Sequence, residues 1–391
     1  MNNWKKVRVG DIGKIVTGKT PRTSIQEYYG GSTPFITPSD DMTVKYIKST
    51  RKKLTTEGKL SVKNCILPKN AICVSCIGSD LGKVVITTEE SVTNQQINSI
   101  IVCEEEYDID FIYYRMKELG KVMNFHSKTS TAVPIINKSQ FSDYTFMCPE
   151  KYIQIRIGEI LSAIDGKIAN NDAINRNLSE QAKVLFEEEL LKFDSVPEGW
   201  KKGSLSDIAD YLNGLAMQKF RSGDDEKGLP VLKIKELRQG SCDANSELCS
   251  LNIKPEYIIH DGDVIFSWSG SLLVDFWCGG ECGLNQHLFK VTSKKYDKWF
   301  YYAWTLYHLD RFIAVAADKA TTMGHIKREE LSKAEVLIPD SDSYKRIGEV
   351  LGPLYDMIIS NRVENRRLAT LRDELLPMLM SGEMDVSEVE L

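Results

Sequence analysis

The chain has 391 residues, which is enough for two or more domains, each with its own hydrophobic core. Apolar residues make up 42 % of it and charged residues 27 %, as in soluble globular proteins and unlike disordered chains. No apolar stretch approaches the roughly 20 residues of a membrane-spanning helix, and residues 1–11 show no signal or transit pattern. The nine cysteines form no compact framework, so we expect free thiols in a reducing cytoplasm.

Charge is unevenly distributed along the chain. The net charge of −5 does not by itself indicate a nucleic-acid-binding protein. Residues 1–63, however, contain 13 Lys and Arg against five Asp and Glu. Such an excess could neutralise phosphates, although a solvated surface balanced by the acidic run at 104–106 would explain it equally well.

The sequence contains one pattern twice. Segments 156–178 and 346–368, aligned at an offset of 190, are identical at ten of 23 positions. The Trp-Lys-Lys run at 4–6 recurs at 200–202, and further matches lie between these points. A period near 190 residues is far longer than the roughly 20–50 residues of a solenoid repeat. The chain therefore holds two copies of a whole domain, each followed by a helix.

This duplication divides the chain into four parts. We expect a strand-rich domain at 1–150, a central helix at 151–193, a second strand-rich domain at 194–340, and a C-terminal helix with its tail at 341–391. Short β-favouring runs punctuated by Gly, Pro and Asp indicate the strands, and a short aromatic helix is predicted within each domain, at 111–119 and at 299–309. The predicted fold class is α+β: two strand-rich domains separated by two long helices, with a pseudo-twofold internal repeat. The order of the strands does not follow from the sequence.

Both long helices carry apolar residues at gaps that alternate between four and three, as in a coiled-coil seam. Asparagines occupy matching positions in the middle of both seams. Because each stripe needs a partner, we predict that the helices pair antiparallel and that the asparagines fix their register. A helix of ~40 residues is roughly 60 Å long and could hold two domains apart. We expect Pro353 to kink the second helix, and Pro377 and Gly382 to end it. The seam comprises Ile157, Leu161, Ile164, Ile168, Asn171, Asn175, Leu178, Ile347, Leu351, Leu354, Ile358, Asn361, Asn365 and Leu368.

Motifs for catalysis are missing from the sequence. It has no phosphate-binding loop, no Gly-rich dinucleotide fingerprint, and no Asn-Pro-Pro-Tyr or Asp-Pro-Pro-Tyr string of an amino-methyltransferase. The five histidines have no metal-binding spacing, and neither Cys73 and Cys76 nor Cys278 and Cys282 has a second pair at zinc-site distance. We therefore predict a chain without catalytic residues, metal or cofactor of its own.

The two domains share a framework of loops that are rich in amides, hydroxyls and cations. Base-edge and phosphate recognition uses such groups, although any single one of them more often caps a turn or marks a bend. The framework repeats while the loop residues differ, as expected if the copies read different sequences. The candidate DNA-binding residues are Lys19, Arg22, Ser39, Lys45, Ser79, Gln95, Gln96, Lys128, Thr129, Lys219, Arg221, Lys233, Lys235, Trp268, Ser269, Gln286, His287, Lys319 and Thr321.

These features resemble the DNA specificity subunit of type I restriction-modification enzymes over nearly the full length. The resemblance rests on the repeated helix start at 156–171, the Trp-Lys opening at 4–12 with the Gly-x-Thr-Pro run at 18–21, the Asp-Gly-Asp run at 261–266, and the repeated Asn-Gln step. The second copy departs from it by lacking Thr-Pro after Gly214. The resemblance implies two target-recognition domains, each reading one half of a bipartite asymmetric site in double-stranded DNA.

The resemblance also implies partners. The paired helices would set the spacer between the half-sites and dock methyltransferase subunits, which methylate adenine N6 of a flipped-out base with S-adenosylmethionine. A restriction and translocase subunit would use ATP and Mg²⁺. Two alternatives remain open: a helical scaffold that binds only proteins, and a single-chain DNA-modifying enzyme, which the missing motifs disfavour.

Overall fold

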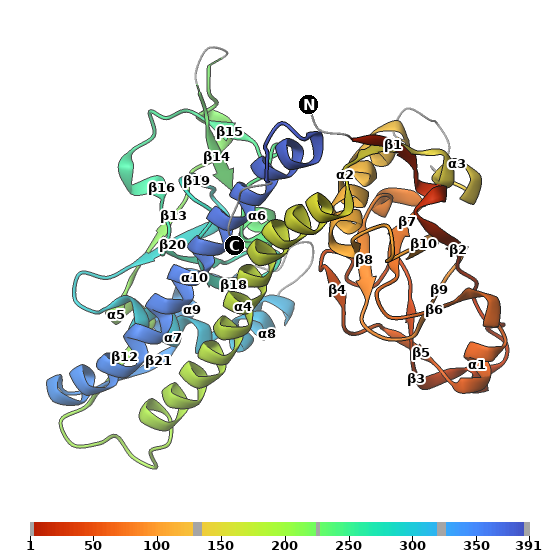
Figure 1. Ribbon diagram of the computed structural model, residues 1–391. Coiled ribbons are helices and arrows are strands. Elements are labelled where there is room, and N and C mark those ends of the chain that lie inside the picture. The colour runs from red at the N-terminus through yellow and green to blue at the C-terminus, as the bar shows by residue number, and fades with distance from the viewer. Residues whose placement is uncertain (1–3, 128–134, 224–226, 319–325, 387–391) are drawn as a thin grey trace. The chain divides into compact units, whose positions relative to one another are not determined.

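The computed structural model describes residues 4–127, 135–223, 227–318 and 326–386, and every structural statement below concerns these residues. The chain forms two compact units: unit 1 is Met1–Gly166 with Ala369–Leu391, and unit 2 is Lys167–Leu368. Their boundaries fall within the two long helices, α4 (Lys151–Leu190) and α10 (Ser341–Ser381). Each unit therefore contains one strand-rich domain and a part of both helices (Figure 1).

Unit 1 contains three sheets, with strand orders β1-β11, β2-β10-β7-β8-β4 and β5-β3-β9-β6. The second of these, the central sheet, is antiparallel except where β4 joins it. The strands are β1 (Lys5–Arg8), β2 (Gly13–Thr17), β3 (Tyr29–Ile36), β4 (Tyr46–Ile47), β5 (Lys52–Leu54), β6 (Ile66–Leu67), β7 (Ile72–Ser75), β8 (Val84–Thr87), β9 (Ser91–Thr93), β10 (Ile97–Val102) and β11 (Thr145–Cys148). The shorter helices are α1 (Thr56–Leu60), α2 (Ile109–Ser127) and α3 (Lys138–Asp143).

Unit 2 repeats this topology, with orders β12-β21, β13-β20-β17-β18 and β15-β14-β19-β16. Each strand takes the place of its counterpart in unit 1, and β4 alone has none among the described residues. The strands are β12 (Lys201–Ser204), β13 (Asp210–Asn213), β14 (Leu229–Leu232), β15 (Leu248–Cys249), β16 (Ile258–Ile259), β17 (Val264–Ser267), β18 (Leu273–Phe276), β19 (Cys282–Leu284), β20 (Leu288–Thr292) and β21 (Glu335–Ile338). The helices are α5 (Leu205–Ile208), α6 (Ile234–Gln239), α7 (Lys298–Tyr307), α8 (Leu309–Asp318) and α9 (Arg328–Ser332).

The core of each domain lies between its central sheet and one helix. In unit 1, α2 lies against β7 and β8 and buries Phe111 and Tyr114. In unit 2, α7 lies against β18 and β20 and buries Phe300 and Trp304. The strands β7 and β17 are buried along their whole length, which explains their continuous runs of apolar and small residues.

Two sequence predictions about the helices need correction. The aromatic helix of the first domain is longer than expected, since α2 extends to Ser127. The second long helix ends before Gly382, which has a φ of +74°, but α10 does not end at Pro377. α10 also runs through Pro353, and the kink expected there stays a prediction. Beyond Pro377, burial of Leu379 and Met380 in the unit 1 core accounts for the final turn.

The described residues contain no disulfide, membrane-spanning helix or metal-binding cluster. All nine cysteines are free thiols. No described helix is long and apolar enough to cross a membrane. Among the same residues, no group of three His, Cys, Asp or Glu side chains is placed to hold a metal ion.

Candidate nucleic-acid interface

The central sheet of unit 1 brings three loops to one end. In its antiparallel register Thr17 lies opposite Asn98, and Ser75 lies opposite Ile97. The ends of β2 and β7 and the start of β10 therefore coincide. Segments 18–20 and 75–78 lie at the ends of β2 and β7, and segment 94–96 leads into β10. We call these three segments the edge loops of unit 1.

The central sheet of unit 2 forms the same end from different residues. Asn213 lies opposite Phe289, and Ser267 lies opposite Leu288. We call the segments 213–215, 267–271 and 285–287 the edge loops of unit 2. The two sets of edge loops are equivalent because the strands that carry them are equivalent.

One backbone contact explains why glycine recurs in both sets. The amide of Gly18 donates to Ile97 O at 3.1 Å, and that of Gly214 donates to Leu288 O at 3.0 Å. A Cβ on Gly18 would overlap the carbonyl oxygen of Asn94, and one on Gly214 would overlap that of Asn285. Only glycine allows this approach, so the repeated glycine fixes the framework rather than contacting a ligand.

The edge loops of unit 1 present amides, hydroxyls and a cation. Thr20 Oγ1 donates to Gln95 Oε1 at 2.7 Å, and Asn94 Nδ2 donates to Gln96 Oε1 at 2.9 Å. Lys19 is exposed and has no ion pair among the described residues. These side chains offer hydrogen-bond donors and acceptors to an adjoining molecule at this end of the sheet.

The edge loops of unit 2 present aromatic groups instead. Trp268 donates from its indole Nε1 to Asn213 Oδ1 at 3.0 Å and stacks on Phe289, with ring centroids 5.7 Å apart. Ser269 Oγ and His287 Nδ1 are hydrogen-bonded at 3.0 Å. Gln286 Oε1 is buried without a hydrogen-bond partner among the described residues.

Three further candidates lie beside these loops. The backbone N–H of Asn94 donates a hydrogen bond to Ile36 O at the end of β3. This contact brings the exposed Ser39, three residues further on, close to the edge loops of unit 1. The equivalent bond from Asn285 to Leu232 O places Lys233 and Lys235 beside those of unit 2. Lys233 is paired with Glu247 at 2.7 Å and Lys235 with Asp243 at 3.4 Å, so acidic neighbours already neutralise both cations in part.

The structure assigns Lys45 a different role from the predicted one. Its ammonium group lies 2.8 Å from Asp110 and 2.7 Å from Ser162 Oγ, and only 9 % of the side chain is exposed. The ring of Tyr114 lies 4.8 Å from the same ammonium group. Lys45 therefore joins the domain to α4 and is removed from the candidate interface, because its charge is already compensated.

The remaining candidates lie elsewhere or cannot be described. Arg22 is exposed beyond the first edge loop, while Lys219 and Arg221 are exposed near β15. No side-chain position is described for Ser79. The candidates Lys128, Thr129, Lys319 and Thr321 lie outside the described residues.

Sequence reasoning missed several residues of this region. Asn213 and Thr20 hold Trp268 and Gln95, and the hydroxyl of the Gly-Lys-Thr-Pro run was an available signal for Thr20. Between residues 48 and 53 of unit 1, four exposed cations also form no ion pair among the described residues. They are Lys48, Arg51, Lys52 and Lys53. The positive excess of residues 1–63 was their only signal.

Comparison with known proteins identifies the family. Residues 1–180 and 197–369 match the type I restriction modification DNA specificity domain. The chain belongs to this family. The MjaIX specificity subunit of Methanocaldococcus jannaschii is 26 % identical over 422 residues, which cover 99 % of this chain and 95 % of that protein. The HindI specificity subunit of Haemophilus influenzae is 34 % identical over 185 residues, which cover 47 % of this chain and 40 % of that protein.

A solved structure shows the same fold. The S subunit of a type I restriction-modification system from M. genitalium matches with a TM-score of 0.61 at 14 % sequence identity. The match covers 99 % of this chain and 97 % of that one. The chain is thus a specificity subunit, the DNA-recognition component of a type I restriction-modification system.

The long helices of the specificity subunit pair antiparallel within unit 2. Asn171 contacts Asn365, Asn175 contacts Asn361, and Glu189 pairs with Arg346, so residue numbers rise along α4 as they fall along α10. Figure 1 shows α4 and α10 side by side here.

The ends of the predicted seam also serve the domain cores. Ile157 and Leu161 are buried in the core of unit 1, and Ile347, Leu351 and Ile358 are buried in that of unit 2. Asn171 and Asn175 are buried between the helices. The other seam residues are half-buried: Ile164, Ile168, Leu178, Leu354, Asn361, Asn365 and Leu368.

Proposed function

We propose that each unit of this specificity subunit reads one half of a bipartite, asymmetric site in double-stranded DNA. The observation that carries the proposal is the equivalence of the two sets of edge loops, which share a backbone and the Asn-Gln step but differ in other side chains. Unit 1 offers Lys19 and has Gln96 at the place of His287, whereas unit 2 offers Trp268 and His287. Different donors and acceptors on one framework suit two different base sequences.

Phosphate contacts would supply most of the affinity. Lys19 and Arg22, together with the exposed cations at 48 and 51–53, could each neutralise a phosphate because no acidic partner competes for them among the described residues. Such contacts position the protein on the duplex, and the edge loops would then specify the bases.

We further propose that α4 and α10 set the spacer between the half-sites and dock two methyltransferase subunits. Those subunits would bind S-adenosylmethionine and methylate adenine N6 of a flipped-out base. A restriction and translocase subunit with ATP and Mg²⁺ would complete the enzyme, and the complex would act on DNA in the cytoplasm. The specificity subunit itself would contribute no catalytic residue.

An exchange experiment tests the proposal. The subunit is assembled with its methyltransferase, and residues 1–150 are replaced by the equivalent domain of another specificity subunit. Sequencing of methylated sites from a random library should show that one half of the site changes while the other half and the spacer stay the same. A change in both halves, or in neither, would contradict separate reading by two domains.

Point variants separate the two kinds of contact. Lys19→Ala should weaken binding to all sequences equally and reduce the slope of log K against log salt by about 0.9. Gln95→Ala should instead relax the preference at one position, with a loss of ~1–3 kcal/mol of discrimination. Lys6→Ala, on a strand outside the central sheet, is the control. Binding of the methyltransferase without any DNA preference would favour the protein-only scaffold.

A further inference from the structure

The helix α10 has a second face next to its seam. The seam residues of this region, such as Ile358, contact α4. Four residues each follow a seam residue by one position, and they are separated by gaps of four, three and four, so they lie on one face of the helix. They are Tyr355, Ile359, Arg362 and Arg366. This face contacts the domain of unit 2: Tyr355 and Ile359 pack against its core, and both arginines form ion pairs with it.

Arg366 binds the turn that precedes β17. Its Nη1 and Nη2 donate to the two carboxylate oxygens of Asp261 at 2.6 and 2.7 Å, and Nη1 also donates to Cys278 O at 2.6 Å. The same carboxylate accepts the backbone amide of Gly280 at 2.9 Å. Burial acts to raise the pKa of Asp261, but the hydrogen bonds from Arg366 and Gly280 lower it, and the net shift is downward.

Arg362 binds the neighbouring strand β18. Its Nη1 donates to Asp275 Oδ1 at 2.7 Å. The adjacent Phe276 stacks on Tyr302, with centroids 3.9 Å apart, and Tyr355 of the same helix face packs against both rings. The ion pair is therefore fixed to the aromatic core of the domain rather than to a mobile surface.

Both ion pairs are sheltered from solvent. The exposed fractions are 31 and 29 % for the side chains of Arg366 and Asp261, and 36 and 25 % for those of Arg362 and Asp275. The pair of Arg366 and Asp261 is bidentate, whereas Arg362 reaches Asp275 through one hydrogen bond and also donates to Phe276 O at 3.4 Å. Partly buried arginine–carboxylate pairs fix geometry more strictly than exposed lysine pairs do. We call these two ion pairs the arginine joint.

The arginine joint lies at one end of the hairpin β17–β18, and the edge loop lies at the other. Asp261 precedes β17 by three residues, and Trp268 and Ser269 follow it directly. A strand of four residues is about 13 Å long and rigid within a sheet. A shift of the hairpin on α10 would therefore be transmitted to Trp268.

Only the second copy of the repeat encodes this joint. At the offset of 190, Asp172 and Arg176 stand at the places of Arg362 and Arg366. The strand pairings put Lys69 and Val85 at the places of Asp261 and Asp275. Only the second copy therefore has both arginines and both carboxylates. The arginine joint is thus an addition to the framework that the two copies share.

We propose that the arginine joint fixes the position of the unit 2 edge loops on α10 and thereby restricts the spacer length that the assembled enzyme accepts. This inference rests on the proposed function. Asp261, Asp275, Arg362 and Arg366 are positioning residues that touch no base. Without them the second domain can tilt on the helix, and half-sites at a neighbouring spacing come within reach.

The test uses the subunit assembled with its methyltransferase and DNA duplexes whose spacer is optimal, one base pair shorter or one base pair longer. Arg366→Glu should raise methylation of the altered spacers relative to the optimal one by at least about fivefold, the effect of losing one charged hydrogen bond. Half-site preference should not change. The milder Arg366→Gln should act in the same direction if the first variant does not assemble.

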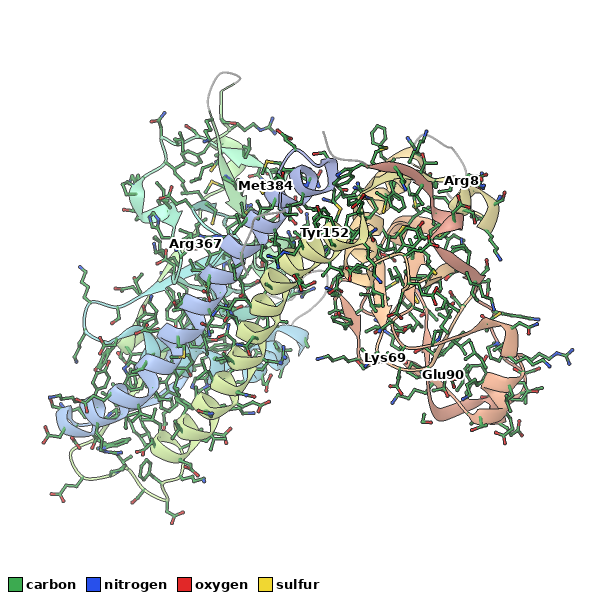
Figure 2. The ribbon with its side chains drawn as sticks, viewed as in Figure 1. Arg8, Lys69, Glu90, Tyr152, Arg367 and Met384 are labelled. Carbon is green, nitrogen blue, oxygen red and sulfur yellow. The ribbon has the colours of Figure 1, made fainter. Side chains whose placement is uncertain are left out.

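Charge exchange and a surface variant are the controls. Asp261→Arg combined with Arg366→Glu should restore the spacer discrimination of the unmodified subunit. Arg367→Glu makes the same charge change at the adjacent exposed residue, labelled in Figure 2, whose charge acts on Asp261 more weakly than that of Arg366, and should lower discrimination far less than Arg366→Glu does. Equal loss of methylation on all three spacers, or no rescue, would overturn the proposal. If the unmodified enzyme showed no sequence preference, the proposed function itself would fail instead.

Discussion

Asn361 Nδ2 donates to Asn175 Oδ1 at 2.9 Å, and one turn away Asn171 Nδ2 donates to Asn365 Oδ1 at 2.8 Å. Asn175 also reaches the carbonyl of Ile358. These amides lie between apolar turns of α4 and α10, where an unpaired amide would be costly. Displacement of one helix by a turn would leave two of the four asparagines opposite apolar side chains. The layer therefore opposes every other register.

The asparagine layer should behave as a coupled unit. Asn175→Ala leaves Asn361 without its acceptor and should lower the free energy of unfolding by ~1–3 kcal/mol. Urea unfolding measures the loss. Asn177→Ala, exposed on the same helix, should change stability by less than about 0.5 kcal/mol. Equal effects of the two variants would show that the layer contributes nothing specific.

A second network ties the domain of unit 1 to both helices. Tyr114 donates its hydroxyl to Asp165 Oδ2 at 2.6 Å, and Arg372 donates to Asp165 Oδ1 at 2.8 Å. Tyr114→Phe removes a hydrogen bond to a charged group, so unfolding should become easier by ~1.5–3 kcal/mol. Tyr152→Phe, labelled in Figure 2 and largely exposed, is the matched control and should have almost no effect.

His308 should make unit 2 sensitive to mild acid. Burial lowers its pKa, more than the hydrogen bond to the Glu335 carbonyl raises it, so the folded state takes up the proton at lower pH than the unfolded state. Below the unfolded value of about 6.5, the unfolded chain binds more protons and stability falls as pH decreases towards the folded pKa. Urea midpoints at pH 7.5 and 5.5 should differ less in His308→Gln. His260→Gln is the control for loss of a surface histidine. An unchanged pH response of His308→Gln would contradict the assignment.

The framework glycines should not tolerate a side chain. Gly214→Ala would force the edge loop away from Asn285, so both the melting temperature and sequence-specific binding should fall. Gly166→Ala is the comparison, because a Cβ there meets no atom and alanine favours the helix by about 0.5–1 kcal/mol. A Gly214→Ala subunit with unchanged binding would show that the loop position is not critical.

The sequence predicted correctly those features that depend on local periodicity or on the repeat within the chain. The helix stripes follow from a period of 3.5 residues, and the matching asparagines follow from the offset of 190. The same reasoning placed Lys45 among the DNA-binding residues, because its charge was visible while Asp110 and Ser162, far away in the sequence, were not. The longer α2 and the continuation of α10 beyond Pro377 likewise depend on burial in a core that the sequence does not display.

The sequence by itself determined that this protein consists of two copies of one domain and that two long helices with polar steps accompany them. Periodicity and repetition are properties of neighbouring residues, so they need no knowledge of the fold. Only the tertiary structure decided which loops meet at one end of each sheet, and that Arg366 binds Asp261, 105 residues earlier in the chain. Those relationships depend on which strands pair. Strands pair through contacts between residues that are far apart in the sequence, and no local sequence pattern encodes such contacts.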